Sequence, residues 1–134
     1  MIELLELSQV LKAVERTGTE VRYYDAECAA EKAAGWYQLT ATVDRLVICP
    51  HNNINHSDLL DTVRHEALHV VQACNKGTPV LSREYYTKNA PQEIKDQVFS
   101  QYPEYHHHHE LEAFMGAKYL SEGDVIQLIN KYCF

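Results

Sequence analysis

The sequence predicts a single α+β domain that spans residues 1–134. Apolar residues recur at helical spacing near the start of the chain, and a long, mostly apolar helical run opens its second half. Short segments rich in β-branched and aromatic residues lie between these regions and are bounded by Gly and Pro. A chain of 134 residues supports one hydrophobic core, and no internal repeat or interdomain linker divides it.

The first half is expected to form one helix and a small, mostly antiparallel sheet. Leucine and valine recur at helical spacing over residues 3–17, and Gly18 follows as a helix-stop signal. The expected strands are residues 21–24, 36–41 and 46–49, with a helical turn at 26–34 between the first two.

The second half is expected to be helical around one long buried helix. Ser57 is a plausible N-cap for this helix, which runs to about Cys74 and is apolar nearly all round. The 75–89 segment has no clear period and is predicted to be a surface loop. Further helices are expected at residues 92–101, 105–120 and 122–132.

Composition and charge exclude several classes of protein. The chain is 46% hydrophobic and 23% charged, which is typical of a globular domain. Its net charge is −7 and no basic cluster interrupts the acidic balance, so we expect no nucleic-acid partner. The first residues are acidic where a signal peptide is basic, and no apolar run reaches membrane-spanning length. These features predict a cytoplasmic protein without a membrane partner.

The four cysteines are expected to be buried free thiols. They are widely spaced and form no C-x-x-C pair, a pattern unlike that of a zinc ribbon or a dense disulfide framework. The residues concerned are Cys28, Cys49, Cys74 and Cys133.

The residues from His65 to His69 form an H-E-x-x-H motif within the long buried helix. Residues four apart share a helix face, so both imidazoles can bind one Zn²⁺ from the same side. The Glu66 carboxylate lies beside the metal and can accept a proton from a zinc-bound water. Two histidines and a glutamate on a buried helix are costly without such a partner, which favours a metal site.

A catalytic zinc ion takes three protein ligands and leaves one position open, so a third ligand is required. A metzincin places Gly and His where this chain has Gln72 and Asn75. Asn75 also removes the third histidine of an H-x-x-x-H-x-x-x-x-x-H site, as found in a family of rRNA-processing nucleases. The third ligand must therefore come from the last third of the chain.

A later segment, Glu110-Leu111-Glu112-Ala113, provides candidates on another predicted helix. An H-E-x-x-H motif followed by E-x-x-A on a later helix resembles the gluzincin group of zinc metallopeptidases, and in particular its short phage and bacterial members. The resemblance covers residues 58–120. It implies a zincin-like fold, a Zn²⁺ cofactor and a peptide or protein substrate.

Two glutamates compete for the third position, and Glu110 is favoured. It shares a helical face with Ala113 and Ala117, whose small side chains allow close approach to the motif helix. Glu112 points about 200° away from that face. The family tends to place Asp or Asn four residues after this ligand to orient a zinc-bound histidine, whereas this chain has Phe114.

The run from His106 to His109 suggests a second metal site or an alternative third ligand, although a solvated loop is the simpler interpretation. Gluzincins commonly stabilise the oxyanion with a histidine or tyrosine. The candidates for that role are one of the four histidines, Tyr85, Tyr86 and Tyr105.

The sequence thus predicts a zinc-dependent peptidase in which His65, His69 and Glu110 bind the metal and Glu66 is the general base. An edge strand between Trp36 and Cys49 is expected to pair with an extended substrate, and the 75–89 loop to wall the cleft. The alternatives are a metal-binding interaction module with little activity and a zinc hydrolase of a non-peptide substrate. The oligomeric state is not specified.

Overall fold

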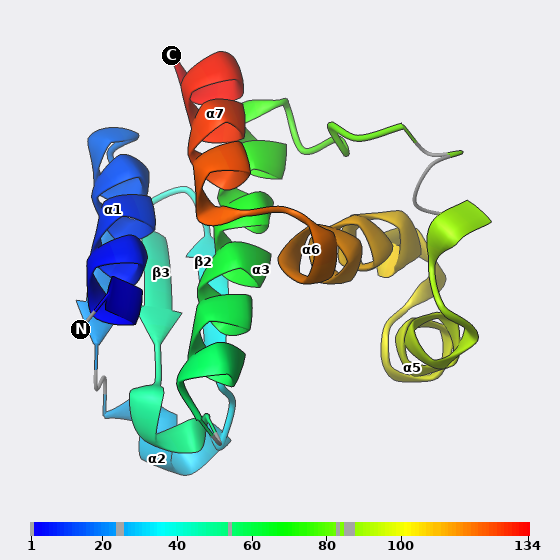
Figure 1. Ribbon diagram of the computed structural model, residues 1–134, viewed down its shortest axis with the longest axis horizontal. Coiled ribbons are helices and arrows are strands. Elements are labelled where there is room, and N and C mark those ends of the chain that lie inside the picture. The colour runs from blue at the N-terminus through cyan, green and yellow to red at the C-terminus, as the bar shows by residue number, and fades with distance from the viewer. Residues whose placement is uncertain (1, 24–25, 54, 83, 85–87) are drawn as a thin grey trace.

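A computed structural model describes residues 2–23, 26–53, 55–82, 84 and 88–134 of the chain. It confirms the α+β class, with a small sheet packed beside α1 (Ile2–Arg16) and α3 (His56–Cys74) (Figure 1). The other helices are α2 (Glu27–Glu31), α5 (Gln92–Gln101), α6 (His107–Tyr119) and α7 (Glu122–Cys133). Short 3-10 helices cover Pro50–Asn52 and Glu104–His106. Within the described ranges, none of the helices combines the length and the apolar character needed to cross a bilayer.

The sheet is mixed rather than mostly antiparallel. It consists of β1 (Glu20–Tyr23), β2 (Gly35–Leu39) and β3 (Asp44–Ile48), with β3 in the centre. β2 pairs antiparallel with β3 through a hairpin, whereas β1 pairs parallel with β3. The parallel pair arises because the chain passes through α2 and β2 before it returns beside β1, a connection that local sequence patterns do not reveal.

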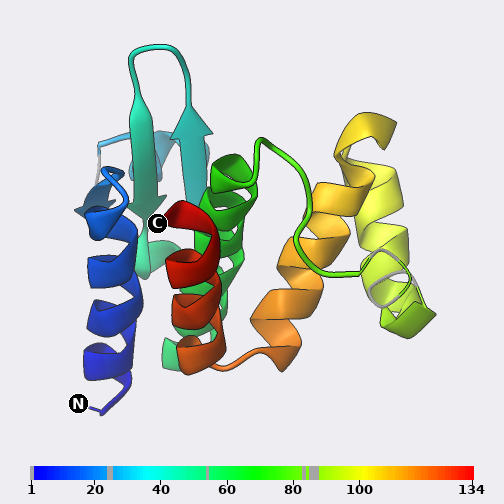
Figure 2. The same ribbon diagram turned by 90° about the horizontal axis from the view of Figure 1, so that it is seen from above.

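Helix α3 is the central element of the fold. It contacts α1, α6, α7, β2 and β3. Figure 2 shows α1, α7 and the sheet on one side of α3, with α5 and α6 on the other. The main core joins α1, β3, α3 and α7, and a second apolar cluster joins α5 and α6. This central position explains why the motif helix is apolar on most of its faces.

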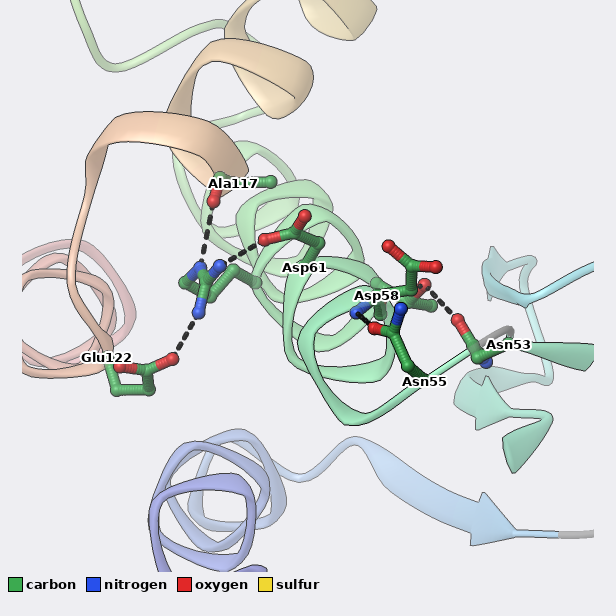
Figure 3. Close-up of polar contacts among 8 residues, drawn as sticks. Asn53, Asn55, Asp58, Asp61, Ala117 and Glu122 are labelled. Atoms are coloured by element: carbon green, nitrogen blue, oxygen red, sulfur yellow. Dashed lines mark hydrogen bonds and ion pairs between the residues drawn. The ribbon is translucent and has the colours of Figure 1, made fainter. Parts of the chain in front are cut away.

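Two contacts fix α6 against α3. Gly116 of α6 lies so close to α3 that a Cβ atom there would stand 2.1 Å from Cδ1 of Leu68. Arg64 of α3 donates a hydrogen bond from Nε to the backbone oxygen of Ala117 at 2.9 Å and forms ion pairs with Asp61 and Glu122. Figure 3 shows these three partners around one point of α3. The contacts hold α6, which carries the glutamate pair, at a fixed distance from the motif.

The N-cap of the motif helix lies two residues earlier than expected. Asn55, not Ser57, is the N-cap, and its side chain accepts a hydrogen bond from the backbone N–H of Asp58 at 2.9 Å (Figure 3). Both residue types cap helices well, so the sequence alone did not separate them.

The expectation of free thiols is wrong. Cys28 of α2 is bonded to Cys49 after β3, and Cys74 at the end of α3 is bonded to Cys133 at the end of α7. No free cysteine remains. The paired residues are 21 and 59 positions apart in sequence. Folding brings their Cα atoms to 5.6 and 5.0 Å, which is within the range that a disulfide spans.

Candidate metal centre

Three predicted ligands come together between α3 and α6. The side chains of His65 and His69 lie one turn apart on α3, and Glu110 lies in the first turn of α6. The Nε2 atom of His65 is 3.1 Å from Oε2 of Glu110, and that of His69 is 3.0 Å from Oε1. One donor atom from each residue lies within 4.8 Å of the others. Within the described part of the chain, this is the only group of three such residues that could hold a metal ion.

The same contacts shift the pKa values of two ligands. Burial alone lowers the pKa of His69, but its hydrogen bond to Glu110 and the charges of Glu66 and Glu110 outweigh burial and raise it to about 9. Burial alone raises the pKa of Glu110, but hydrogen bonds and positive charge from the two histidines lower it to about 2. In the absence of a metal, a histidine–carboxylate ion pair therefore occupies the site.

This ion pair predicts the pH dependence of the metal-free protein. The folded pKa of His69 is raised from 6.5 to about 9, so its stabilisation is complete below pH 6.5 and is lost as the pH rises through 9. The folded pKa of Glu110 is lowered from 4.5 to about 2, so its stabilisation is present above pH 4.5 and is lost as the pH falls through 2. Chelator-treated protein should be most stable between pH 4.5 and 6.5, with about 3 kcal/mol lost at either extreme.

Thermal melting between pH 2 and pH 10 measures this profile. A Glu110→Gln variant removes the ion pair, so both limbs of its profile should flatten. A variant profile that runs parallel to that of the wild type over the whole range contradicts the assignment.

Glu66 lies beside the ligand group and lines two adjoining cavities. Its Oε1 atom is 3.9 Å from Nε2 of His65, and the residue is buried. A cleft of about 850 Å³ contains Glu66 together with all three ligands. A second cavity of about 440 Å³ also reaches Glu66 and His65, and Ile94, Phe114 and Ala117 contribute to its apolar wall. The carboxylate thus faces the cleft and lies close to the three candidate ligands.

Phe114 occupies the position at which the resemblance to gluzincins implies Asp or Asn. Phe114 packs on the ring of His65 with a centroid separation of 4.5 Å and an interplanar angle of 75°. This edge-to-face contact restrains the imidazole by shape rather than by a hydrogen bond.

Glu112, the competing ligand, is directed away from the metal group. Its side chain is 0% exposed, and its carboxylate accepts hydrogen bonds from the backbone N–H groups of Val80 and Leu81. It also accepts one from Nε2 of Gln72 at 3.0 Å. The choice of Glu110 as the third ligand stays a prediction, and Glu112 is a buried anchor for the loop that follows α3.

The four-histidine run does not form a second cluster of potential ligands in the described structure. Nε2 of His107 lies 2.8 Å from the backbone oxygen of Tyr102, and Nε2 of His109 lies 2.5 Å from that of Gly77. These two histidines attach the start of α6 to neighbouring segments, and His106 and His109 line the large cleft.

Several residues of the cleft were not selected from the sequence. Tyr102 lines it, and burial together with the charges of Glu110 and Glu66 raises the pKa of its phenol to about 12. Trp36 and Tyr37 of β2 also line it. Tyr105 lines the cleft as well, while Tyr85 and Tyr86 lie outside the described residues. No local sequence pattern distinguishes Tyr102 from the other eight tyrosines.

Comparison with curated proteins and with solved structures gives no significant match. One family model, described as a domain of unknown function (DUF8637), matches residues 2–134. The match covers the metal group, the cleft and both disulfides, and the chain therefore belongs to the DUF8637 family.

Proposed function

We propose that this protein is a zinc-dependent peptidase of the zincin-like type. The observation that carries the proposal is the convergence of His65, His69 and Glu110 beside Glu66 in one cleft. Two imidazoles and one carboxylate are the donor set of a catalytic zinc site, which leaves a coordination position open. A zinc ion bound there would polarise a carbonyl group and lower the pKa of a bound water.

The cleft offers features suited to an extended peptide. β2 is an edge strand of the three-stranded sheet and supplies Gly35, Trp36 and Tyr37 to the cleft wall. Its free edge can pair with the backbone of a peptide or protein substrate. The loop that follows α3 contributes Lys76 and Gly77 to the lining of the same cleft, and we assign it the role of a cleft wall.

The proton transfers are assigned to Glu66. Its carboxylate accepts a proton from the attacking water and delivers it to the leaving amine. Tyr102, Tyr105 and His106 line the same cleft and are the candidates that stabilise the developing oxyanion. Tyr102 joins this group because its phenol lies within the electrostatic influence of Glu66 and Glu110.

Glu66→Gln tests this function. Zinc-loaded wild-type protein should cleave members of a peptide library, and the variant should cleave them about 10²- to 10⁴-fold more slowly because its amide cannot accept the proton. Zinc content should not change, since Glu66 lies outside the ligand group. A chelator should abolish cleavage, and Glu93→Gln on α5 is a matched control that should retain the full rate. Cleavage by Glu66→Gln at the wild-type rate would contradict the assignment of Glu66 as the general base.

The contact between Phe114 and His65 favours one alternative, a metal-binding interaction module with little activity. An apolar partner gives the imidazole no additional basicity, whereas a carboxylate would. Zinc binding without cleavage of any peptide supports this alternative. Hydrolysis of another substrate class that depends on Glu66 supports the third possibility, a non-peptide zinc hydrolase.

The cytoplasmic location remains a prediction, and the two disulfides argue against it. Disulfides form and persist in oxidising compartments and are rare where thioredoxin and glutathione reduce thiols. A peptidase held together by both bonds fits an oxidising environment better.

A further inference from the structure

We propose that Gln72 is a positioning residue that holds His69 in the tautomer able to bind metal through Nε2, and that Glu112 fixes the orientation of Gln72. The proposal rests on the metal site at His65, His69 and Glu110. It assigns a role to two buried polar residues that do not belong to the ligand group.

The orientation of the Gln72 amide follows from its partners. Gln72 is 3% exposed and lies three residues after His69 on α3. Its Nε2 atom donates to the backbone oxygen of His109 and to Oε1 of Glu112, both at 3.0 Å. Both amide hydrogens are thereby used, because a carbonyl and a carboxylate can only accept. The amide oxygen must therefore face the other way.

That oxygen faces the imidazole of His69. Oε1 of Gln72 lies 2.8 Å from Nδ1 of His69, and an amide oxygen cannot donate. Nδ1 must consequently carry the proton. In the neutral ring the lone pair then resides on Nε2, which is the atom directed at Glu110 and the ligand group. With the opposite tautomer, Nε2 would carry a proton and could not bind the metal.

Glu112 extends the arrangement to the loop after α3. Its carboxylate accepts from the N–H of Val80 at 2.9 Å and from that of Leu81 at 2.7 Å. These two donors and Gln72 require it to act as an acceptor on every side. Glu110 and Glu112 stand two residues apart on α6, so one short segment supplies both a ligand and the group that orients another ligand. We name the chain of hydrogen bonds from Leu81 through Glu112 and Gln72 to His69 the orienting relay.

A Glu112→Gln substitution tests the relay without touching a ligand. The new amide keeps the shape of the side chain but turns an NH₂ group toward other donors, either Gln72 or the loop N–H groups. Rotation of the Gln72 amide relieves the first conflict and places its NH₂ group against Nδ1 of His69. Zinc affinity should fall about 10- to 100-fold, as is usual when a partner of a metal ligand is lost. Gln72→Met, which removes the acceptor, should have the same effect.

Zinc affinity is measured by competition with a chromophoric chelator, and the tautomer by long-range ¹H–¹⁵N NMR of the zinc-loaded protein. The wild type should show a protonated Nδ1 on His69. The double variant Gln72→Glu with Glu112→Gln should recover part of the affinity, because the carboxylate at position 72 accepts from both His69 and the amide at position 112, although it loses the hydrogen bond to the backbone oxygen of His109. A purely structural loss would not be rescued in this way.

Asn75→Ala is the control for loosening of the loop. The Asn75 side chain donates from Nδ2 to Thr78 and Pro79, and its hydrogen bond to Gln72 joins two backbone atoms that alanine keeps, so zinc affinity should stay at the wild-type value. Thermal melting of each variant without metal verifies that it folds. Unchanged affinity in both Glu112→Gln and Gln72→Met overturns the relay, as does a double variant no better than the single one. A wild type that binds no zinc overturns the proposed metal site itself.

Discussion

Replacing His65 or Glu110 by alanine should reduce the zinc content from about one ion per chain to almost none. Each residue supplies one of the three donor atoms that lie within 4.8 Å of each other. Two protein donors bind zinc much more weakly than three, so buffer and water should displace the ion. Zinc should also stabilise the wild type by about 4 kcal/mol at a free concentration 1,000 times the dissociation constant, and neither variant should show this gain.

Elemental analysis measures the metal on protein purified without a nickel column, since the histidine run could bind nickel. Glu104→Ala and His106→Ala are matched controls, because both residues are exposed, lie near the start of α6 and stand outside the ligand group. They should retain the full zinc content. Zinc retained in His65→Ala, or absent from the reconstituted wild type, contradicts the site.

The helical part of the fold could be predicted because its signals are local. Apolar spacing identified α1, a nearly all-round apolar run identified α3, and helix start and stop signals indicated α5, α6 and α7. The motif placed both histidines on one face of α3. The parallel pairing of β1 with β3 could not be predicted, because it depends on the path of the chain between them. The cysteine pairs were missed for the same reason, since residues 21 and 59 positions apart meet only after folding.

In the candidate site, too, residues with a local sequence signal were predicted and residues that depend on contacts between helices were not. Helix geometry favoured Glu110 over Glu112 as the third ligand, because Glu110 shares a helix face with the small residues Ala113 and Ala117. It did not reveal the role of Gln72. The acceptors that fix its amide come from α6, and no local pattern connects the two helices. Residues that orient ligands are therefore harder to predict than the ligands, whose spacing is imposed by one metal ion.

Removing both disulfides should destabilise the protein by an amount comparable to its whole folding free energy. The chain-entropy model gives about 3 kcal/mol for the 21-residue separation and about 4 kcal/mol for the 59-residue separation. A small domain is usually stable by about 5–15 kcal/mol, so the reduced chain should be close to unfolding at 37 °C. We expect a melting temperature at least 15 °C below that of the oxidised protein, from about 3–5 °C per kcal/mol at this chain length.

Paired alanine variants separate the two bonds. Cys74→Ala with Cys133→Ala should have the larger effect, because this bond closes the longer loop and ties the end of α3 to α7, whose Val125 and Ile129 belong to the main core. Cys28→Ala with Cys49→Ala should cost less, since this bond joins only the short α2 to the end of β3. Thiol titration of denatured wild type should find no free cysteine. Four free thiols and a melting temperature insensitive to reductant would instead mean that the core holds the fold without covalent links. The disulfides would then give no support for an oxidising compartment.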